Sequence, residues 1–285
     1  MTIFGSHKDC TLLLVSTRLP TLLRQSAHLK TRCTSVTRTA MSISLPPEIF
    51  DLIVEHMREE RETLKACSVV SKSWIPRARR HLFARVEFHH INSPLGLWVE
   101  AFPDPSDSPA HHTRHLSISS VPDVIAATVA HAWIRAFCNI VSLTVRTNAW
   151  HDRQTSLVPL HTLSSTLKSL HLVYDSIPPS EVFGLICSFP ALEDLALTVF
   201  GCEETEIYAL PSTSLKFTGT LSLARKDGVR FDIWRLLALP GGLHFTKILV
   251  GCLEEDFESI TDLVSACRNT LEIICIIQCS QVRSH

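Results

Sequence analysis

The chain has 285 residues, 27 Lys and Arg against 28 Asp and Glu, and a hydrophobic share of 45%. This composition excludes a largely disordered protein, and the balanced charge gives no indication of nucleic-acid binding. The length suits a small module followed by one larger domain. No apolar run approaches the roughly 20 residues that a membrane helix requires, so we expect no membrane partner.

Residues 1–40 are basic, with Asp9 as their one acid, and they are rich in Ser and Thr. A mitochondrial transit peptide has this composition. We favour a disordered leader, or an extension ahead of an internal start at Met41, because the folded pattern begins just after that residue. The expected location is therefore the cytoplasm or nucleus, with mitochondrial import as the alternative.

Ten cysteines raise the question of a disulfide framework. No two of them are spaced as CxxC, so the pattern of a zinc ribbon is absent. Five lie in apolar runs, where a free thiol behaves as a small hydrophobic side chain: Cys67, Cys138, Cys187, Cys267 and Cys275. We expect reduced thiols, as in the cytosol or nucleus, rather than a secreted disulfide scaffold.

The pattern of residues 45–88 predicts three short helices. Pro46 and Pro47 suit a first helical turn, and Glu48 lies where the helix dipole favours an acid. Thr63 is the expected cap of the second helix, and Pro76 begins a basic third helix. Helical spacing gives one apolar face to each of the first two helices: Ile49, Leu52, Ile53, His56 and Met57, then Leu64, Cys67, Val70 and Trp74.

Three helices of this length make a marginal domain of about 40 residues. Their apolar side chains exceed what so small a core can hide, which predicts a partner-binding face. The alternative is that these helices simply cap the domain that follows.

The same segment resembles an F-box, in particular the F-box proteins that are abundant in mushroom-forming fungi. The resemblance rests on the LPPE opening and on the runs CSVVSKSW and ARRHLF, with a charged and slightly long loop at residues 59–62 as a departure. It implies an F-box over residues 41–85 that binds the adaptor subunit of SCF-type cullin–RING ligases. The matching adaptor-binding positions are Leu45, Pro46, Pro47, Glu48, Ile49, Ile53, Leu64, Cys67, Val70 and Trp74.

Downstream, a pattern of three apolar residues recurs. Relative to the first residue, the second lies three positions later and the third five positions later. The copies are centred on Leu116, Leu143, Leu170, Leu195, Leu221, Ile248 and Ile274, with Val86 as a candidate earlier copy. Thr113 and Thr218 take the first position of two weaker copies. Because the step between the seven later centres stays at 25–27 residues, each copy predicts a short strand in a regular array.

Helical return segments are expected at residues 93–102, 123–137, 180–189, 232–239 and 254–267, and none at residues 201–214. The spacing resembles that of leucine-rich repeats, whose periods are about 20–29 residues. The resemblance implies an α/β solenoid over residues 86–285, with irregular strand and helix repeats of about 26 residues and a parallel sheet. Only Asn148 and Cys279 fit the consensus Asn or Cys, so the curvature stays open. The alternative is an ordinary α/β domain with parallel strands.

A recognition surface is expected on the strand positions between the inward residues. The candidates are Thr144, Arg146, Ser169, His171, Asp194, Thr198 and Lys247. They mix polar and small groups without a dominant charge, so they do not identify the ligand. The last repeat is strongly apolar and has no polar cap, which indicates either a covered strand edge or a chain truncated at the C-terminus.

The sequence contains no GxxxxGK[ST], GxGxxG or GxSxG motif, so nothing indicates a nucleotide site or a hydrolase nucleophile. His111 and His115 have metal-ligand spacing for a helix, but they lead directly into a predicted strand. Cys275 and Cys279 lie in an apolar, β-branched run, which favours strand packing. We therefore predict no catalytic residue, no metal and no cofactor.

The two resemblances imply a substrate-recognition subunit of an SCF-type E3 ubiquitin ligase, in which the F-box binds the adaptor and the solenoid binds a protein substrate. Its mechanism is proximity, since tethering raises the effective concentration of substrate near the transfer machinery. One alternative is a repeat scaffold with a helical N-terminal cap and no ligase role. The other is an enzyme on the repeat loops, which requires converging titratable groups in a pocket.

Overall fold

The structure is a computed structural model that describes residues 46–70, 72–88, 94–119, 127–146, 157–163, 165–175, 177–200, 215, 217–225, 233–239, 241–252 and 257–278. These residues belong to one compact unit, Leu45–His285. The leader expected at residues 1–40 lies outside the described residues, as does Leu45. No helix in the described part of the chain combines the length and apolar character that crossing a membrane requires.

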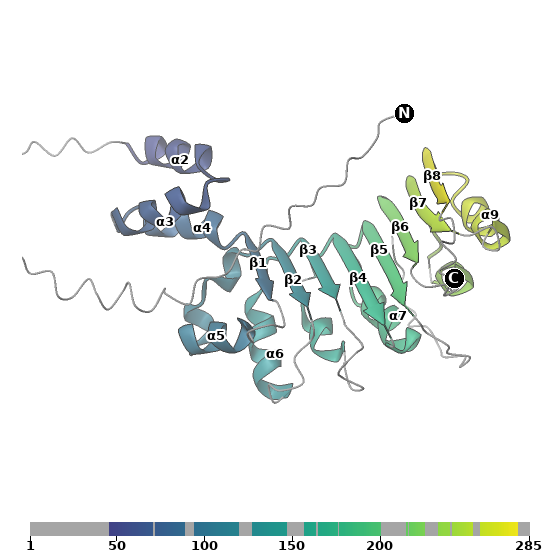
Figure 1. Ribbon diagram of the computed structural model, residues 1–285, viewed down its shortest axis with the longest axis horizontal. Coiled ribbons are helices and arrows are strands. Elements are labelled where there is room, and N and C mark those ends of the chain that lie inside the picture. The colour runs from purple at the N-terminus through teal and green to yellow at the C-terminus, as the bar shows by residue number, and fades with distance from the viewer. Residues whose placement is uncertain are drawn as a thin grey trace, which may run out of the picture. The chain divides into compact units, whose positions relative to one another are not determined.

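The described residues form one parallel sheet of eight strands, in which each strand pairs with the next one along the chain (Figure 1). The expected α/β fold with a parallel sheet is therefore present. The strands are β1 (Arg85–Phe88), β2 (His115–Ser119), β3 (Ser142–Arg146), β4 (Ser169–Asp175), β5 (Asp194–Phe200), β6 (Thr220–Arg225), β7 (Lys247–Cys252) and β8 (Ile273–Gln278).

The central residue of each predicted strand pairs with the central residue of the next. The run of pairs goes from Val86 through Leu116, Leu143, Leu170, Leu195, Leu221 and Ile248 to Ile274. All of these side chains are buried except Ile274, in the last strand. The constant step thus has a physical cause, because each return segment brings the chain back one strand further along in the same register.

The first position of the triplet is buried in most copies but not in all. Ile140, Leu167, Leu192 and Phe245 are fully buried three residues before their strand centres. The expectation for Thr218 is wrong, because this residue is exposed and its neighbour Phe217 is buried instead. The larger and more apolar Phe217 side chain occupies the interior position, where its ring stacks on Phe245 at a centroid distance of 4.8 Å.

Helices occupy the expected return segments. They are α5 (Pro94–Ala101), α6 (Ala127–Ala136), α7 (Pro179–Cys187), α8 (Ile233–Leu237) and α9 (Phe257–Ala266). Figure 1 shows α5, α6 and α7 along the same side of the sheet, and the buried core contains both strand and helix side chains. The opposite face of the sheet carries the half-buried and exposed alternate residues of the strands.

Three short 3₁₀ helices were not anticipated: η2 (Pro105–Asp107), η3 (Pro109–His112) and η4 (Val158–Thr162). Each has a proline in its first turn, where the missing N–H costs no hydrogen bond. Asp104 and Ser108 cap the first two, accepting hydrogen bonds from the backbone N–H of Ser106 and Ala110. Residues 201–214, for which no helix was expected, lie outside the described residues.

Ahead of the sheet, the described residues form three helices: α2 (Pro47–His56), α3 (Arg61–Val70) and α4 (Ile75–Leu82). The buried side chains of this helical segment are Val54, Leu64, Cys67 and Ala78. The predicted cap at Thr63 is wrong, because α3 already begins at Arg61. The hydroxyl of Thr63 instead donates to Glu60 Oε2 at 2.9 Å.

The prediction that Trp74 continues the face of the second helix is also wrong. α3 ends at Val70, and Trp74 directly precedes α4. Pro76 cannot donate a backbone hydrogen bond, so a new helix starts at this point. The Trp74 ring packs edge-on against Phe50 of α2, with centroids 5.3 Å apart.

A cluster of aromatic rings joins the end of α4 to the first strand and its helices. Trp98 of α5 lies at its centre and contacts four rings at centroid distances of 5.1–5.8 Å: Phe83, Phe88, Phe102 and Phe137. Such pairs contribute about 0.5–1.5 kcal/mol each beyond their burial. The cluster therefore fixes the connection between the helical segment and the sheet.

Candidate partner-binding surfaces

The helical segment exposes large aliphatic side chains. Ile49 and Leu52 of α2 are 39% and 66% exposed, and Val69 and Val70 of α3 are 81% and 70% exposed. Ile49 and Leu52 are three residues apart, so they share one face of α2. These four residues, two on α2 and two on α3, are together called the aliphatic face, and their exposure matches the expectation that the segment has more apolar surface than its core can hide.

The predicted adaptor-binding residues that the structure describes differ in exposure. Pro46, Pro47, Glu48, Ile49 and Val70 are exposed, and Ile53 and Trp74 are partly buried. Leu64 and Cys67 are buried inside the helical segment, so they support the surface rather than form it. Leu52 and Val69 were not among the predicted positions, although Leu52 lies in the same apolar spacing as Ile49 and Ile53.

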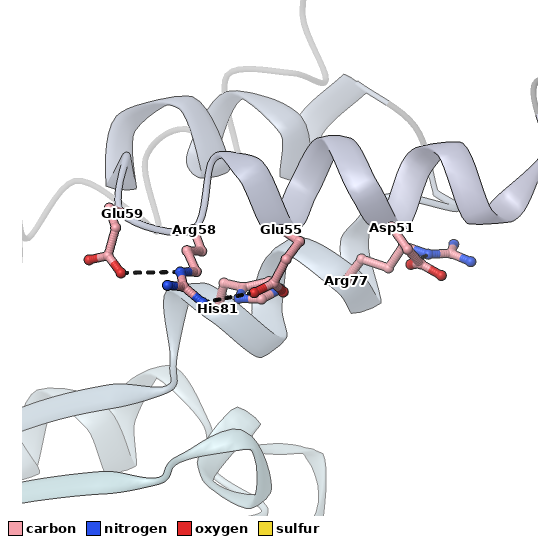
Figure 2. Close-up of polar contacts among 6 residues, drawn as sticks. All are labelled: Asp51, Glu55, Arg58, Glu59, Arg77 and His81. Carbon is pink, nitrogen blue, oxygen red and sulfur yellow. Dashed lines mark hydrogen bonds and ion pairs between the residues drawn. The ribbon is translucent and has the colours of Figure 1, made fainter.

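Ion pairs connect α2 to α4 on the side of the segment drawn in Figure 2. Arg77 of α4 pairs with Asp51, and His81 Nε2 lies 3.4 Å from Glu55 Oε2. Arg58 approaches Glu55 at 3.1 Å and Glu59 at 3.4 Å. At least one partner of each pair is more than half exposed, so each pair adds little to stability. The side of α2 that carries these charged residues is therefore not the side that exposes Ile49 and Leu52.

The predicted substrate-facing residues lie in adjacent rows across the open face of the sheet. Thr144 pairs with His171, Ser169 pairs with Asp194, and Val173 pairs with Thr198. Arg146 ends β3 and is exposed, whereas Lys247 begins β7, opposite Thr220. The structure therefore brings Thr144, Arg146, Ser169 and His171 together, while Lys247 lies several strands away.

Two of these residues differ in how free they are to contact a ligand. The Asp194 carboxylate accepts a hydrogen bond from the backbone N–H of Thr220 at 2.6 Å, so it holds the start of β6. His171 is half-buried, and burial together with the nearby Arg146 charge lowers the pKa of its imidazole. At neutral pH His171 is thus predominantly uncharged, with both ring nitrogens available as one donor and one acceptor.

The last strand has an apolar character on both faces. Ile273, Ile274, Ile276 and Ile277 of β8 are all about half exposed. Ile274 and Ile276 align with Ile248 and Val250, which are buried one strand earlier. The described residues contain no polar cap over this edge, in line with the pattern of the sequence.

The described residues hold no candidate metal site. They contain no group of three or more His, Cys, Asp and Glu side chains that could hold a metal ion. His111 belongs to η3 and bonds Ser108 O through Nδ1 at 3.0 Å, whereas His115 begins β2, so the two do not share a helix. Cys279 lies outside the described residues.

The described cysteines are free thiols, and three of the five that lie in apolar runs are buried. Cys67, Cys187 and Cys267 are buried, whereas Cys138 and Cys275 are exposed. Burial raises the pKa of Cys187 to about 11 and also raises the pKa of Cys267. The buried thiols therefore behave as apolar packing groups.

Comparison of the chain with models of known protein families and with curated proteins gave no match.

Proposed function

We propose that the chain is a substrate-recognition subunit of an SCF-type cullin–RING E3 ubiquitin ligase. In this proposal the helical segment is an F-box that binds the adaptor subunit. The strand and helix repeats that follow are a leucine-rich-repeat-like solenoid that holds a protein substrate. The chain performs no chemical step itself, and it acts by raising the effective concentration of substrate near the transfer machinery.

The observation that carries the proposal is the aliphatic face. A helical segment of about 40 residues gains stability by burying such side chains against a partner. Exposed Ile49, Leu52, Val69 and Val70 are the type of anchor that helical grooves of a partner accept. The exposed Pro46, Pro47 and Glu48 lie at the start of α2, in the LPPE opening that forms part of the F-box resemblance.

One observation favours the alternative of a repeat scaffold with a helical cap. α4 contacts η3, and the pKa of His112 in η3 is lowered by burial, by His111 and by the nearby charges of Arg80 and Arg79. The helical segment is therefore packed onto the start of the repeats, as a terminal cap would be. A cap, however, gives no reason for the aliphatic face to stay exposed.

Co-purification of the full chain with the SCF adaptor subunit tests the proposal. We expect the wild type to bind and a Leu52→Ser/Val70→Ser variant to bind at least about tenfold more weakly, because two buried anchors are lost. Both side chains are exposed in the free chain, so the variant is expected to keep its fold, which circular dichroism checks.

Phe257→Ser is the matched control. Phe257 is also an exposed apolar residue, 44% exposed, but it belongs to α9 near the other end of the sheet. Equal loss of binding in both variants would show a non-specific apolar interaction. Absence of wild-type binding, with the protein folded, would overturn the ligase proposal and leave the capped scaffold.

A further inference from the structure

The last strand of the sheet has an open edge in the described part of the chain. β8 pairs with β7 on one side, and the strand order ends at β8 (Figure 1). The backbone N–H of Ile273 donates to Thr246 O at 3.1 Å, so Ile273 directs its hydrogen-bonding groups toward β7. Because this direction alternates along a strand, Ile274 and Ile276 direct their N–H and C=O groups toward the open edge.

The side chains along this edge are apolar and accessible. Residues 273–277 carry no charge and no proline, which are the means by which proteins usually keep a sheet edge from pairing with another chain. Pairing with a further strand would therefore bury apolar surface and satisfy the outward backbone groups at the same time. The four isoleucines are between 42% and 60% exposed, and the cysteine between them is also exposed: Ile273, Ile274, Cys275, Ile276 and Ile277.

The sequence of this edge is symmetric about Cys275. It reads Ile-Ile-Cys-Ile-Ile over residues 273–277, so it is the same in both directions. In an antiparallel pair of two copies centred on Cys275, Ile274 of one copy lies opposite Ile276 of the other. Both residues direct N–H and C=O groups outward, so each of the two such pairs exchanges two hydrogen bonds. Backbone direction and side-chain pattern thus agree on one register, and the strand that matches it is the same strand of a second copy.

We propose that β8 pairs antiparallel with β8 of a second copy of this chain, across a twofold axis at Cys275. The two sheets then form one continuous sheet, in which Ile273 of one copy contacts Ile277 of the other. A twofold axis makes this a closed interface, so association stops at the dimer. The inference goes beyond the proposed ligase role and does not depend on it, because β8 and the helical segment ahead of β1 lie at opposite ends of the strand order.

Sedimentation equilibrium of the full chain under reducing conditions tests the inference. We expect a reversible equilibrium of monomer and dimer without larger species, in the micromolar range because the paired strands are short. The test variant is Ile273→Glu/Ile277→Glu, which places like charges opposite each other at both ends of the paired strands. We expect this variant to dimerise at least about tenfold more weakly than the wild type.

Ile273→Glu/Ile277→Lys is the matched control, because it removes the same two side chains. Antiparallel pairing places each introduced carboxylate opposite an introduced ammonium group of the second copy, so we expect stronger dimerisation than in the variant with two acids. Within one chain the two positions are about 13 Å apart along the strand, too far for the two charges to pair. Both isoleucines are more than half exposed, so both variants are expected to fold, which circular dichroism checks.

Cys275 reports the register of the two strands. It lies opposite Cys275 of the second copy in a pair without backbone hydrogen bonds, whose Cα atoms are about 4.5 Å apart, within the range of about 4.4–6.8 Å that a disulfide spans. Oxidation by copper–phenanthroline and oxygen is expected to link the dimer, since two thiols lose two protons and two electrons to the oxidant. Cys275→Ser should abolish the linked dimer, whereas Cys138→Ser, which removes another exposed thiol, should retain it.

Three results would overturn the inference. A monomer at every concentration would exclude a second copy as the partner of β8 and leave the edge to another segment of this chain or to a different protein. Equally strong dimerisation of the two charged variants would place the contact elsewhere on the molecule. A linked dimer that survives Cys275→Ser would refute the register.

Discussion

Gly219 is the residue at which the backbone leaves no room for a side chain. A Cβ atom there would collide with Asp194 Oδ1 and lie 3.0 Å from Glu193 O. The same Asp194 oxygen accepts the hydrogen bond that starts β6. We therefore expect Gly219→Ala to lower the free energy of unfolding by about 1–3 kcal/mol, measured by urea denaturation.

Gly184 is the control for this prediction, because its surroundings leave room for a Cβ atom. It lies inside α7, and an added Cβ would meet only His161 Cε1, at 3.7 Å, which is ordinary contact. Gly184→Ala is expected to stabilise the protein by about 0.5–1 kcal/mol, because alanine loses less backbone entropy in a helix. Equal effects of the two substitutions would contradict the steric argument.

Thr113 has a polar hydroxyl in a fully buried position. It occupies the first position of a repeat, is fully buried, and its hydroxyl has no hydrogen-bond partner in the described part of the chain. Thr113→Val keeps the shape and removes the unsatisfied group, so we expect a gain of about 1 kcal/mol in unfolding free energy.

The control for Thr113 is Thr270, which directly precedes the first position of the last repeat. Thr270 Oγ1 is satisfied, because it donates to the carbonyls of Phe245 and Cys267, both at 3.2 Å. Thr270→Val is expected to cost about 1 kcal/mol instead. The hypothesis of an unsatisfied hydroxyl fails if Thr113→Val is also destabilising in thermal or urea unfolding.

At the scale of a single element, α2 has two faces with different roles. Val54 is fully buried against the other helices, whereas Leu52 is 66% exposed. Val54→Ala removes two buried methyl groups and is expected to cost about 1.5–2 kcal/mol, with faster amide hydrogen exchange in α2. Leu52→Ala is expected to change stability by less than about 0.5 kcal/mol and to weaken adaptor binding.

This pair of variants separates folding from partner binding. If Leu52→Ala destabilises α2 as much as Val54→Ala, the exposed side chain would be part of the segment's own core. If Val54→Ala leaves hydrogen exchange in α2 unchanged, the helix would not depend on the interior seen in the structure. Either result would remove the physical basis of the aliphatic face.

The strands were predictable because their signal is repeated and their register is shared. Leu143 and Leu170 have the same local pattern and pair directly in the sheet. The helix ends were not predictable. The apolar spacing from Val70 to Trp74 continues past Val70, where α3 ends. Apolar periodicity also missed Val54, because α2 carries more apolar residues than one face can hold, and only packing decides which of them is buried.

The candidate site was predictable in position but not in detail. Alternation along the strands correctly places Thr144 and His171 on the open face, as neighbours in one row. This alternation does not predict the environment of Asp194, whose carboxylate accepts a hydrogen bond from the backbone N–H of Thr220 in the next strand. This hydrogen bond depends on the loop that precedes the next strand, and strand periodicity does not predict loop conformation.

At the scale of the whole molecule, several histidines share one direction of pKa shift. Burial lowers the pKa of His112, His115, His161 and His171. The unfolded chain, with ordinary values near 6.5, then binds protons that the folded chain does not take up. Stability is therefore complete above about pH 6.5 and is lost as the pH falls through the lowered folded values.

We expect the urea midpoint to fall between about pH 7.5 and about pH 5.5, and to fall less steeply in a His112→Gln variant. His112 suits this test because its ring centroid lies 3.9 Å from that of His111, and His111 and two arginines of α4 add repulsion when it is protonated. Acid should therefore loosen the contact between η3 and α4 first. His161 is a weaker choice, because the nearby Glu181 raises its pKa against the effect of burial. A midpoint that rises on acidification, or an unchanged slope in His112→Gln, would contradict this account.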